Sequence, residues 1–123
     1  LSKKMMTAAT PREQIRLIIE MSYDWIVNHE EYSKTIMSLS LQVGKFPQVQ
    51  KMVDGKIEGT LQFYKHLFDG LGFDNPEMEA KIFAAILDGI GLQYASIGDK
   101  MGIEDMKQFL IDKYCNHTKP TKT

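Results

Sequence analysis

The residues of this chain that could do metal chemistry are few and widely spaced. Its three histidines are His29, His66 and His117, and no carboxylate stands three residues before any of them. The Glu-x-x-His unit of di-iron helix bundles is therefore missing. His66 and Asp69 can share one face of a helix, but two ligands do not make a metal site. We expect no bound metal.

Nucleophilic and cofactor chemistry is equally weakly supported. Cys115 is the only cysteine, which excludes an internal disulfide, and on a helix it would point away from His117. The segment GIGLQY, from Gly89 to Tyr94, begins like a dinucleotide-binding loop but lacks the third glycine and follows no predicted strand. We therefore expect no cofactor and no enzymatic activity, although a helical enzyme stays among the alternatives.

One carboxylate stands in unusually apolar surroundings. Asp88 is the only formal charge in the fifteen residues from Ile82 to Ser96. A buried carboxylate without a partner would lose much solvation free energy. We therefore expect its side of the helix to open to water or to accept bonds from a neighbouring helix end. A polar handle for a ligand and a hydrogen bond across a dimer interface are the functional alternatives.

The composition favours one globular domain and excludes several classes of protein. The chain has 123 residues, of which 43 % are hydrophobic, enough for a single core. Its net charge of −1 is unlike that of a domain that neutralises many phosphates. Its longest stretches without a charge are ten residues, half of what a membrane-spanning helix needs, so we expect no transmembrane segment. We predict a cytoplasmic protein.

Helix signals divide the chain into five amphipathic helices and no sheet. Thr10, Pro11 and Glu13 form a capping box that begins the first helix, and Asn28 and His29 end it. A second helix is expected to carry Tyr32, Ile36, Met37 and Leu39 and to continue through the alternating segment 38–43. The third runs from Pro47 to Gly70, the fourth from Pro76 to Ser96 after an Asn75 cap, and the fifth from Ile103 to Asn116. Gly55 and Gly59 should weaken the third helix unless a neighbouring helix needs the space.

The fourth helix is apolar nearly all round and so needs cover on two sides. One stripe holds large residues, and the other holds mostly small residues that would let a second helix come close. The large stripe consists of Ile82, Ile86, Ile90 and Ile97, and the small stripe of Ala80, Ala84, Leu87, Gly91 and Ala95.

Three segments together resemble the C-terminal effector-binding and dimerisation domain of tetracycline-repressor-like (TetR-family) transcriptional regulators. They are PREQIRLIIEMSYDWIVNHEEYSKTIMSLSLQ, NPEMEAKIFAAILDGIGLQYASIG and IEDMKQFLIDKYC, and the similarity covers about Thr10 to Cys115. The most telling part is ILDGIGLQY, followed after a short loop by an amphipathic helix that ends in Tyr-Cys. The pattern contains no catalytic residue.

The resemblance implies an all-α, five-helix domain whose last two long helices form a four-helix bundle with those of a second copy. It implies the ligand-sensing domain of a bacterial transcriptional repressor, in which an unknown small effector changes the DNA affinity of a helix-turn-helix domain. We expect residues 1–9 to end a linking helix from that missing domain, 10–116 to form the sensing domain, and 117–123 to be a disordered tail. An apolar or amphipathic effector is expected.

Two sets of site residues follow from the resemblance. The expected ligand-binding residues are Met21, Trp25, Met52, Phe63, Tyr64 and Leu67. The expected homodimer interface consists of Ala84, Leu87, Asp88, Gly91, Tyr94, Met106, Leu110 and Tyr114. The alternatives are a helical adaptor module, whose apolar surface binds a different partner, and a lipid carrier with no link to DNA.

Overall fold

The computed structural model describes residues 10–29, 31, 34, 35, 38, 39 and 45–116, and all the regular structure among them is helical. The α-helices are α2 (Pro11–Asn28), α4 (Pro47–Gly70), α5 (Pro76–Ile97) and α6 (Ile103–Cys115). A 3₁₀ turn, η2 (Gly98–Met101), joins α5 to α6. The predicted all-α class is confirmed, whereas the predicted count of five helices and the bundle between two copies are not.

The second predicted helix falls on a stretch that the structure describes only in part. Tyr32, Ile36 and Met37 lie outside the described residues, as do residues 40–43 of the alternating segment, residues 1–9 and residues 117–123. Ser38 and Leu39, where that segment begins, are helical. The assignments of the two chain ends therefore stay predictions.

Local capping signals begin two of the helices where the sequence places them. The Thr10 hydroxyl accepts a hydrogen bond from the Glu13 backbone N–H at 3.1 Å and donates one to the Glu13 carboxylate at 3.0 Å. The Asn75 side chain accepts from the Met78 N–H at 3.2 Å. In both helices a proline occupies the first turn, where its missing N–H has no helical partner to lose.

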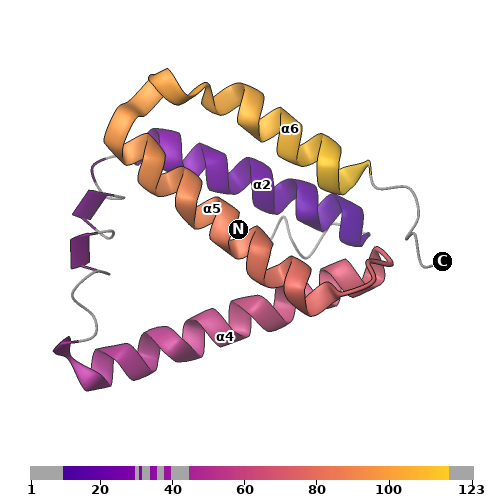
Figure 1. Ribbon diagram of the computed structural model, residues 1–123, viewed down its shortest axis with the longest axis horizontal. Coiled ribbons are helices and arrows are strands. Elements are labelled where there is room, and N and C mark those ends of the chain that lie inside the picture. Colours follow the sequence, from indigo (N-terminus) through magenta and orange to yellow (C-terminus); the bar gives the residue numbers. More distant parts are fainter. Residues whose placement is uncertain (1–9, 30, 32–33, 36–37, 40–44, 117–123) are drawn as a thin grey trace.

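Helix α2 is the centre of the arrangement. It packs against α4, α5 and α6, and α4 also packs along α5. In Figure 1, α5 and α6 are joined through η2 and lie on either side of α2, and α4 crosses below α5. Because α5 and α6 are joined at η2 and both lie on α2, the space between them has α2 beneath it.

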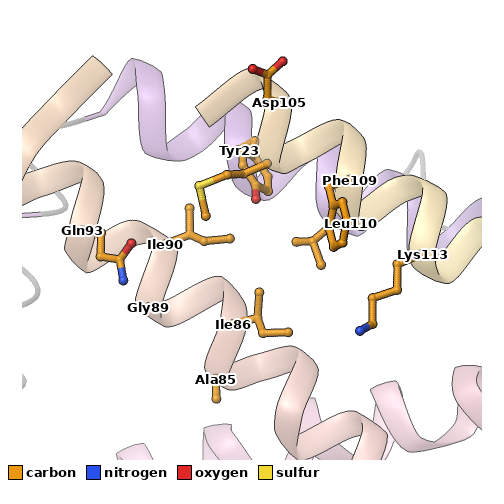
Figure 2. Close-up of a pocket in the computed structure, with 11 residues that line it drawn as sticks. Tyr23, Ala85, Ile86, Gly89, Ile90, Gln93, Asp105, Phe109, Leu110 and Lys113 are labelled. Carbon is orange, nitrogen blue, oxygen red and sulfur yellow. The ribbon is translucent and has the colours of Figure 1, made fainter. Parts of the chain in front are cut away.

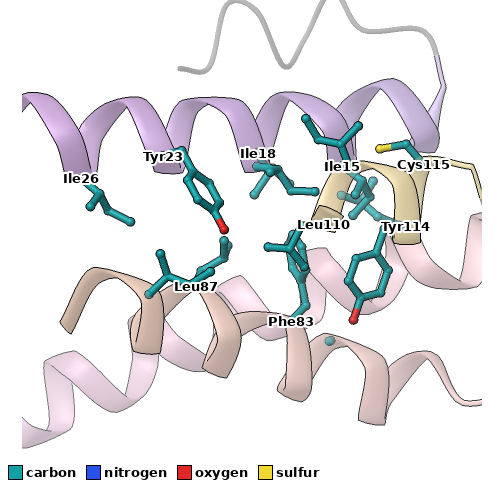
Figure 3. Close-up of a cluster of buried hydrophobic side chains, with 14 of the residues drawn as sticks. Ile15, Ile18, Tyr23, Ile26, Phe83, Leu87, Leu110, Tyr114 and Cys115 are labelled. Carbon is teal, nitrogen blue, oxygen red and sulfur yellow. The ribbon is translucent and has the colours of Figure 1, made fainter. Parts of the chain in front are cut away.

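An aromatic cluster holds α4, α5 and α6 together. The Phe83 ring lies 5.3 Å from Phe68 and 5.4 Å from Tyr114, both in edge-to-face geometry, and Phe68 also meets Phe73 at 5.3 Å. Edge-to-face pairs at these distances are favourable beyond their burial. Figure 3 shows this region continuing along α2 through Ile15 and Ile18.

The ends of α2, α4 and α6 meet closely. The Cys115 thiol donates to the Arg12 carbonyl at 3.7 Å, which links the last turn of α6 to the first turn of α2. A Cβ added at Gly70 would lie 2.8 Å from Cγ of Pro11, closer than two carbon atoms can pack. Gly70, which we predicted as the end of its helix, is therefore also required by the approach of α2.

Candidate functional site

The described residues form a groove between α5 and α6. It has a volume of about 630 Å³ and opens to solvent along one side. Volumes of this size are typical of sites for small molecules. Figure 2 shows Ile86 and Ile90 of α5 on one wall and Phe109 and Leu110 of α6 on the other. The full lining consists of Tyr23, Ala85, Ile86, Gly89, Ile90, Gln93, Asp105, Met106, Phe109, Leu110 and Lys113.

The floor of the groove carries a buried hydroxyl. Tyr23 comes from α2 and is only 1 % exposed, and Figure 2 shows its hydroxyl pointing into the space between α5 and α6. Among the described residues this hydroxyl has no hydrogen-bond partner. Burial raises the pKa of Tyr23 to about 12, so the group keeps its proton and is a donor at neutral pH.

The rim of the groove is mixed in character. Phe109 is 69 % exposed, which is unusual for so large an apolar side chain. Lys113 stands one turn further along α6, with its ammonium 5.9 Å from the centroid of the Tyr114 ring. Gln93 and Asp105 supply the remaining polar groups of the lining. The site therefore combines an apolar trough, a neutral donor at its floor and a cation at its edge.

The residues predicted for the dimer interface do not share one surface. Leu87, Gly91, Tyr94 and Tyr114 are buried inside the chain's own core, and Ala84 is half-buried. Met106 and Leu110 line the groove. Asp88 is exposed. The stripe of small residues on α5 thus faces inward.

The stripe of large residues on α5 faces the groove and the solvent, except that Ile90 is also buried in the core. Ile86 and Ile90 line the groove, while Ile82 and Ile97 are 49 % and 50 % exposed. Met78, one turn before Ile82, is half exposed as well. The sequence therefore predicts the two stripes of this helix, and the structure shows that the chain itself covers the small stripe together with Ile90 of the large one.

The six predicted ligand-binding residues lie outside the groove. Leu67 is in the core, and Tyr64 packs edge-to-face on Phe83 at 5.1 Å. Trp25 stacks on the His29 ring at 3.8 Å. The other three occupy α2 and α4 with increasing exposure: Met21 is half-buried, Phe63 is 41 % exposed and Met52 is 71 % exposed. Their role in ligand binding stays a prediction.

The surroundings of Asp88 agree with an open side of the helix. The residue is exposed, although its apolar neighbours desolvate the carboxylate enough to raise its pKa. The pKa of Tyr64 is raised by burial and, to a smaller extent, by the Asp88 charge. Asp88 therefore lies near the α4 side of α5, and it is not among the residues that line the groove.

The described residues contain no group of three or more histidine, cysteine or acidic side chains placed to hold a metal. Cys115 is buried, and desolvation raises its thiol pKa, although Arg16 and Arg12 oppose the shift. A protonated, covered thiol is a poor nucleophile. His117 lies outside the described residues.

Of the helices that the structure describes, α5 is the one with the length and apolar composition that a membrane crossing requires, with a mean hydropathy of 1.2. Core helices of soluble proteins meet the same criterion, and six residues of α5 are buried in the chain's own core.

Comparison with protein-family models, with curated proteins and with solved structures finds no match to this chain. The resemblance to tetracycline-repressor-like regulators therefore rests on the sequence segments quoted above.

Proposed function

We propose that this chain is a ligand-sensing and homodimerising domain of a TetR-type transcriptional regulator. The observation that carries the proposal is the apolar surface left open on its last two helices. Met78, Ile82 and Ile97 of α5 and Phe109 of α6 are each at least 49 % exposed. Large apolar side chains that are exposed together on neighbouring helices favour an interaction site.

The position of this surface supports a second copy of the chain as its partner. Helix α5 is covered by α2 and α4, and it leaves Met78, Ile82 and Ile97 exposed. Two copies related by a two-fold axis would place α5 and α6 of each against those of the other, and each surface would cover the same surface of its partner. We therefore place the interface on Met78, Ile82, Ile97 and Phe109, next to the stripe of small residues that the sequence suggested.

The regulatory role would be a shift between conformations. A ligand that binds one arrangement of the helices better than another changes their populations by its difference in affinity. In a dimeric regulator that change alters the separation of two helix-turn-helix domains, which must match two half-sites about one helical turn apart. The present chain would supply the sensing and pairing part of this mechanism.

The solution mass tests the proposal directly. Light scattering at several concentrations around micromolar should give about twice 14.1 kDa for the wild type. Phe109→Glu should give a folded monomer, because a carboxylate at the centre of an apolar interface would be desolvated without a partner. Met52→Glu is the matched control, since Met52 is 71 % exposed but lies on α4, and it should stay dimeric.

Two results would count against the proposal. A wild type that stays monomeric throughout the concentration range would remove the dimer and favour a monomeric lipid carrier, for which the open groove would be the binding site. A dimer that is lost equally in both variants would place the interface elsewhere, on or near α4.

A further inference from the structure

We infer that the groove between α5 and α6 binds a small amphipathic anion, such as a medium-chain carboxylate. The anionic oxygen of this ligand accepts a hydrogen bond from the Tyr23 hydroxyl. The inference deepens the proposed function, on which it rests for the sensing role, by naming the site and the class of the ligand. The ligand occupies the groove, whereas the second copy of the chain contacts its outer edges at Ile82, Ile97 and Phe109.

The Tyr23 hydroxyl is a buried donor without an acceptor among the described residues. A donor removed from water without a partner is costly, and such groups are rare in folded proteins. Tyr23 is 1 % exposed, has no hydrogen-bond partner among the described residues, and points into the groove (Figure 2). A phenylalanine would fill the same space without that cost, so the hydroxyl is best explained by an acceptor that arrives with a ligand.

The walls of the groove are mostly apolar. Ile86 and Phe109 offer apolar surface, to which the mostly buried Ile90 and Leu110 add little. Gly89 leaves open space, since no other described residue lies within 4 Å of a Cβ built there. Met106 adds a flexible thioether that can adjust to different shapes. An unbranched hydrocarbon chain would fit such a trough without requiring specific polar contacts.

The lining of the groove contains two charged side chains, Lys113 and Asp105. The Lys113 ammonium at the edge of the groove favours an anion over a neutral or cationic molecule, and Tyr23 can donate to that anion from the floor. Asp105, also in the lining, is the charge that opposes this preference. Because a hydrogen bond to a charged group is stronger than one to a neutral group, we expect Tyr23 to contribute most of the headgroup selectivity.

The experiment titrates the full chain with sodium decanoate, below the concentration at which it forms micelles, by isothermal calorimetry. Tyr23→Phe should raise the Kd about ten-fold, the effect expected for loss of one hydrogen bond to a charged group. Lys113→Gln should raise it by a smaller factor. Tyr114→Phe is the matched control, because Tyr114 is as deeply buried as Tyr23 but lies outside the groove, and the Kd of this variant should equal that of the wild type.

Thermal unfolding without ligand separates binding from a purely structural role. Tyr23→Phe should be at least as stable as the wild type, because the substitution removes an unpartnered polar group, yet it should bind decanoate more weakly. A second variant, Ile86→Trp, should fill the groove and abolish binding while circular dichroism shows unchanged helix content. A merely structural Tyr23 would change stability and leave the Kd alone.

Three outcomes would overturn the inference: no decanoate binding by the folded wild type, an unchanged Kd in Tyr23→Phe, or equally tight binding of decyltrimethylammonium. Light scattering on the same samples keeps these failures distinct from failure of the proposed function. A dimer that does not bind decanoate would contradict the inference alone, and a monomer that binds it through Tyr23 would contradict the dimer alone.

Discussion

Two buried tyrosines show how burial and hydrogen bonding act on one kind of side chain. Tyr114 is 1 % exposed, and its hydroxyl donates a hydrogen bond to the Glu79 carboxylate. Tyr23 is equally buried, but its hydroxyl has no hydrogen-bond partner among the described residues. The pKa of each is raised to about 12. Desolvation is the largest cause for both, and the Glu79 charge and hydrogen bond add to it for Tyr114.

These shifts predict a loss of stability at alkaline pH. A tyrosine whose pKa is raised in the folded state holds its proton more tightly there than in the unfolded chain, where the pKa is about 10. Its stabilising contribution is therefore complete below pH 10 and is lost as the pH rises from 10 to 12. Each such tyrosine can lower the free energy of unfolding by at most about 1.4 kcal/mol per pH unit in this window.

Urea unfolding at a series of pH values between 9 and 12 measures the effect. The informative quantity is the difference between the wild type and Tyr23→Phe, because the two proteins share every other titratable group. The variant should lose stability less steeply, because it lacks one of the two tyrosines. Equal slopes for the two proteins would show that Tyr23 ionises as readily in the folded chain as in the unfolded one.

At the scale of the element, the glycines of α4 have opposite roles at its middle and its end. Gly55 and Gly59 lie in the exposed part of the helix, and nothing stands within 4 Å of a Cβ built at either one. No helix among the described residues uses the space, so both glycines cost helix stability. At Gly70 the same added carbon would meet the Pro11 ring at 2.8 Å.

Alanine should therefore have opposite effects at two positions of one helix. Gly59→Ala should raise the free energy of unfolding by about 0.5–1 kcal/mol, through better helix propensity and a less flexible unfolded chain. Gly70→Ala should lower it by about 1–3 kcal/mol, because a proline ring cannot move aside without shifting α2. Chemical unfolding of the two variants checks the pair, and a stabilised Gly70→Ala would show that the ends of α2 and α4 are farther apart than the structure has them.

The helix ends could be predicted from the sequence because their signals are local. Thr10, Asn75 and the prolines that follow them mark the first turns through contacts that span only three residues. The side of α5 that the chain covers could not be predicted in this way. Both of its stripes are apolar, so the choice between Leu87 and Ile86 as the inward residue depends on where α2 and α4 pack.

The groove likewise cannot be predicted from local sequence patterns. The apolar spacing of α2 places Tyr23 on the side of Ile19 and Ile26, which indicates burial, but it carries no information on whether the hydroxyl finds a partner. Phe109 lies in an amphipathic helix whose other apolar residues are buried or partly buried, and its exposure follows from the divergence of α5 and α6 on α2. Pairing of helices that are distant in sequence decides both features.

At the scale of the whole molecule, one aromatic cluster connects three of the four α-helices that the structure describes. Phe83 of α5 contacts Tyr64 and Phe68 of α4 and Tyr114 of α6 at ring separations of 5.1–5.4 Å. It is fully buried. Loss of this ring should therefore weaken the contacts of α4 and α6 together, and a small domain has only about 5–15 kcal/mol of total stability to lose.

Phe83→Ala should lower the free energy of unfolding by about 3–5 kcal/mol, through lost burial and the cavity left among the surrounding rings. Phe46→Ala is the matched control, because Phe46 is 56 % exposed at the start of α4, and its effect should stay below about 1 kcal/mol. Urea unfolding, followed both by circular dichroism and by fluorescence of Trp25, compares the two. If the cluster connects the helices, the two signals of Phe83→Ala should shift together to lower urea concentration. A shift in only one signal would mean that part of the chain unfolds independently of this cluster.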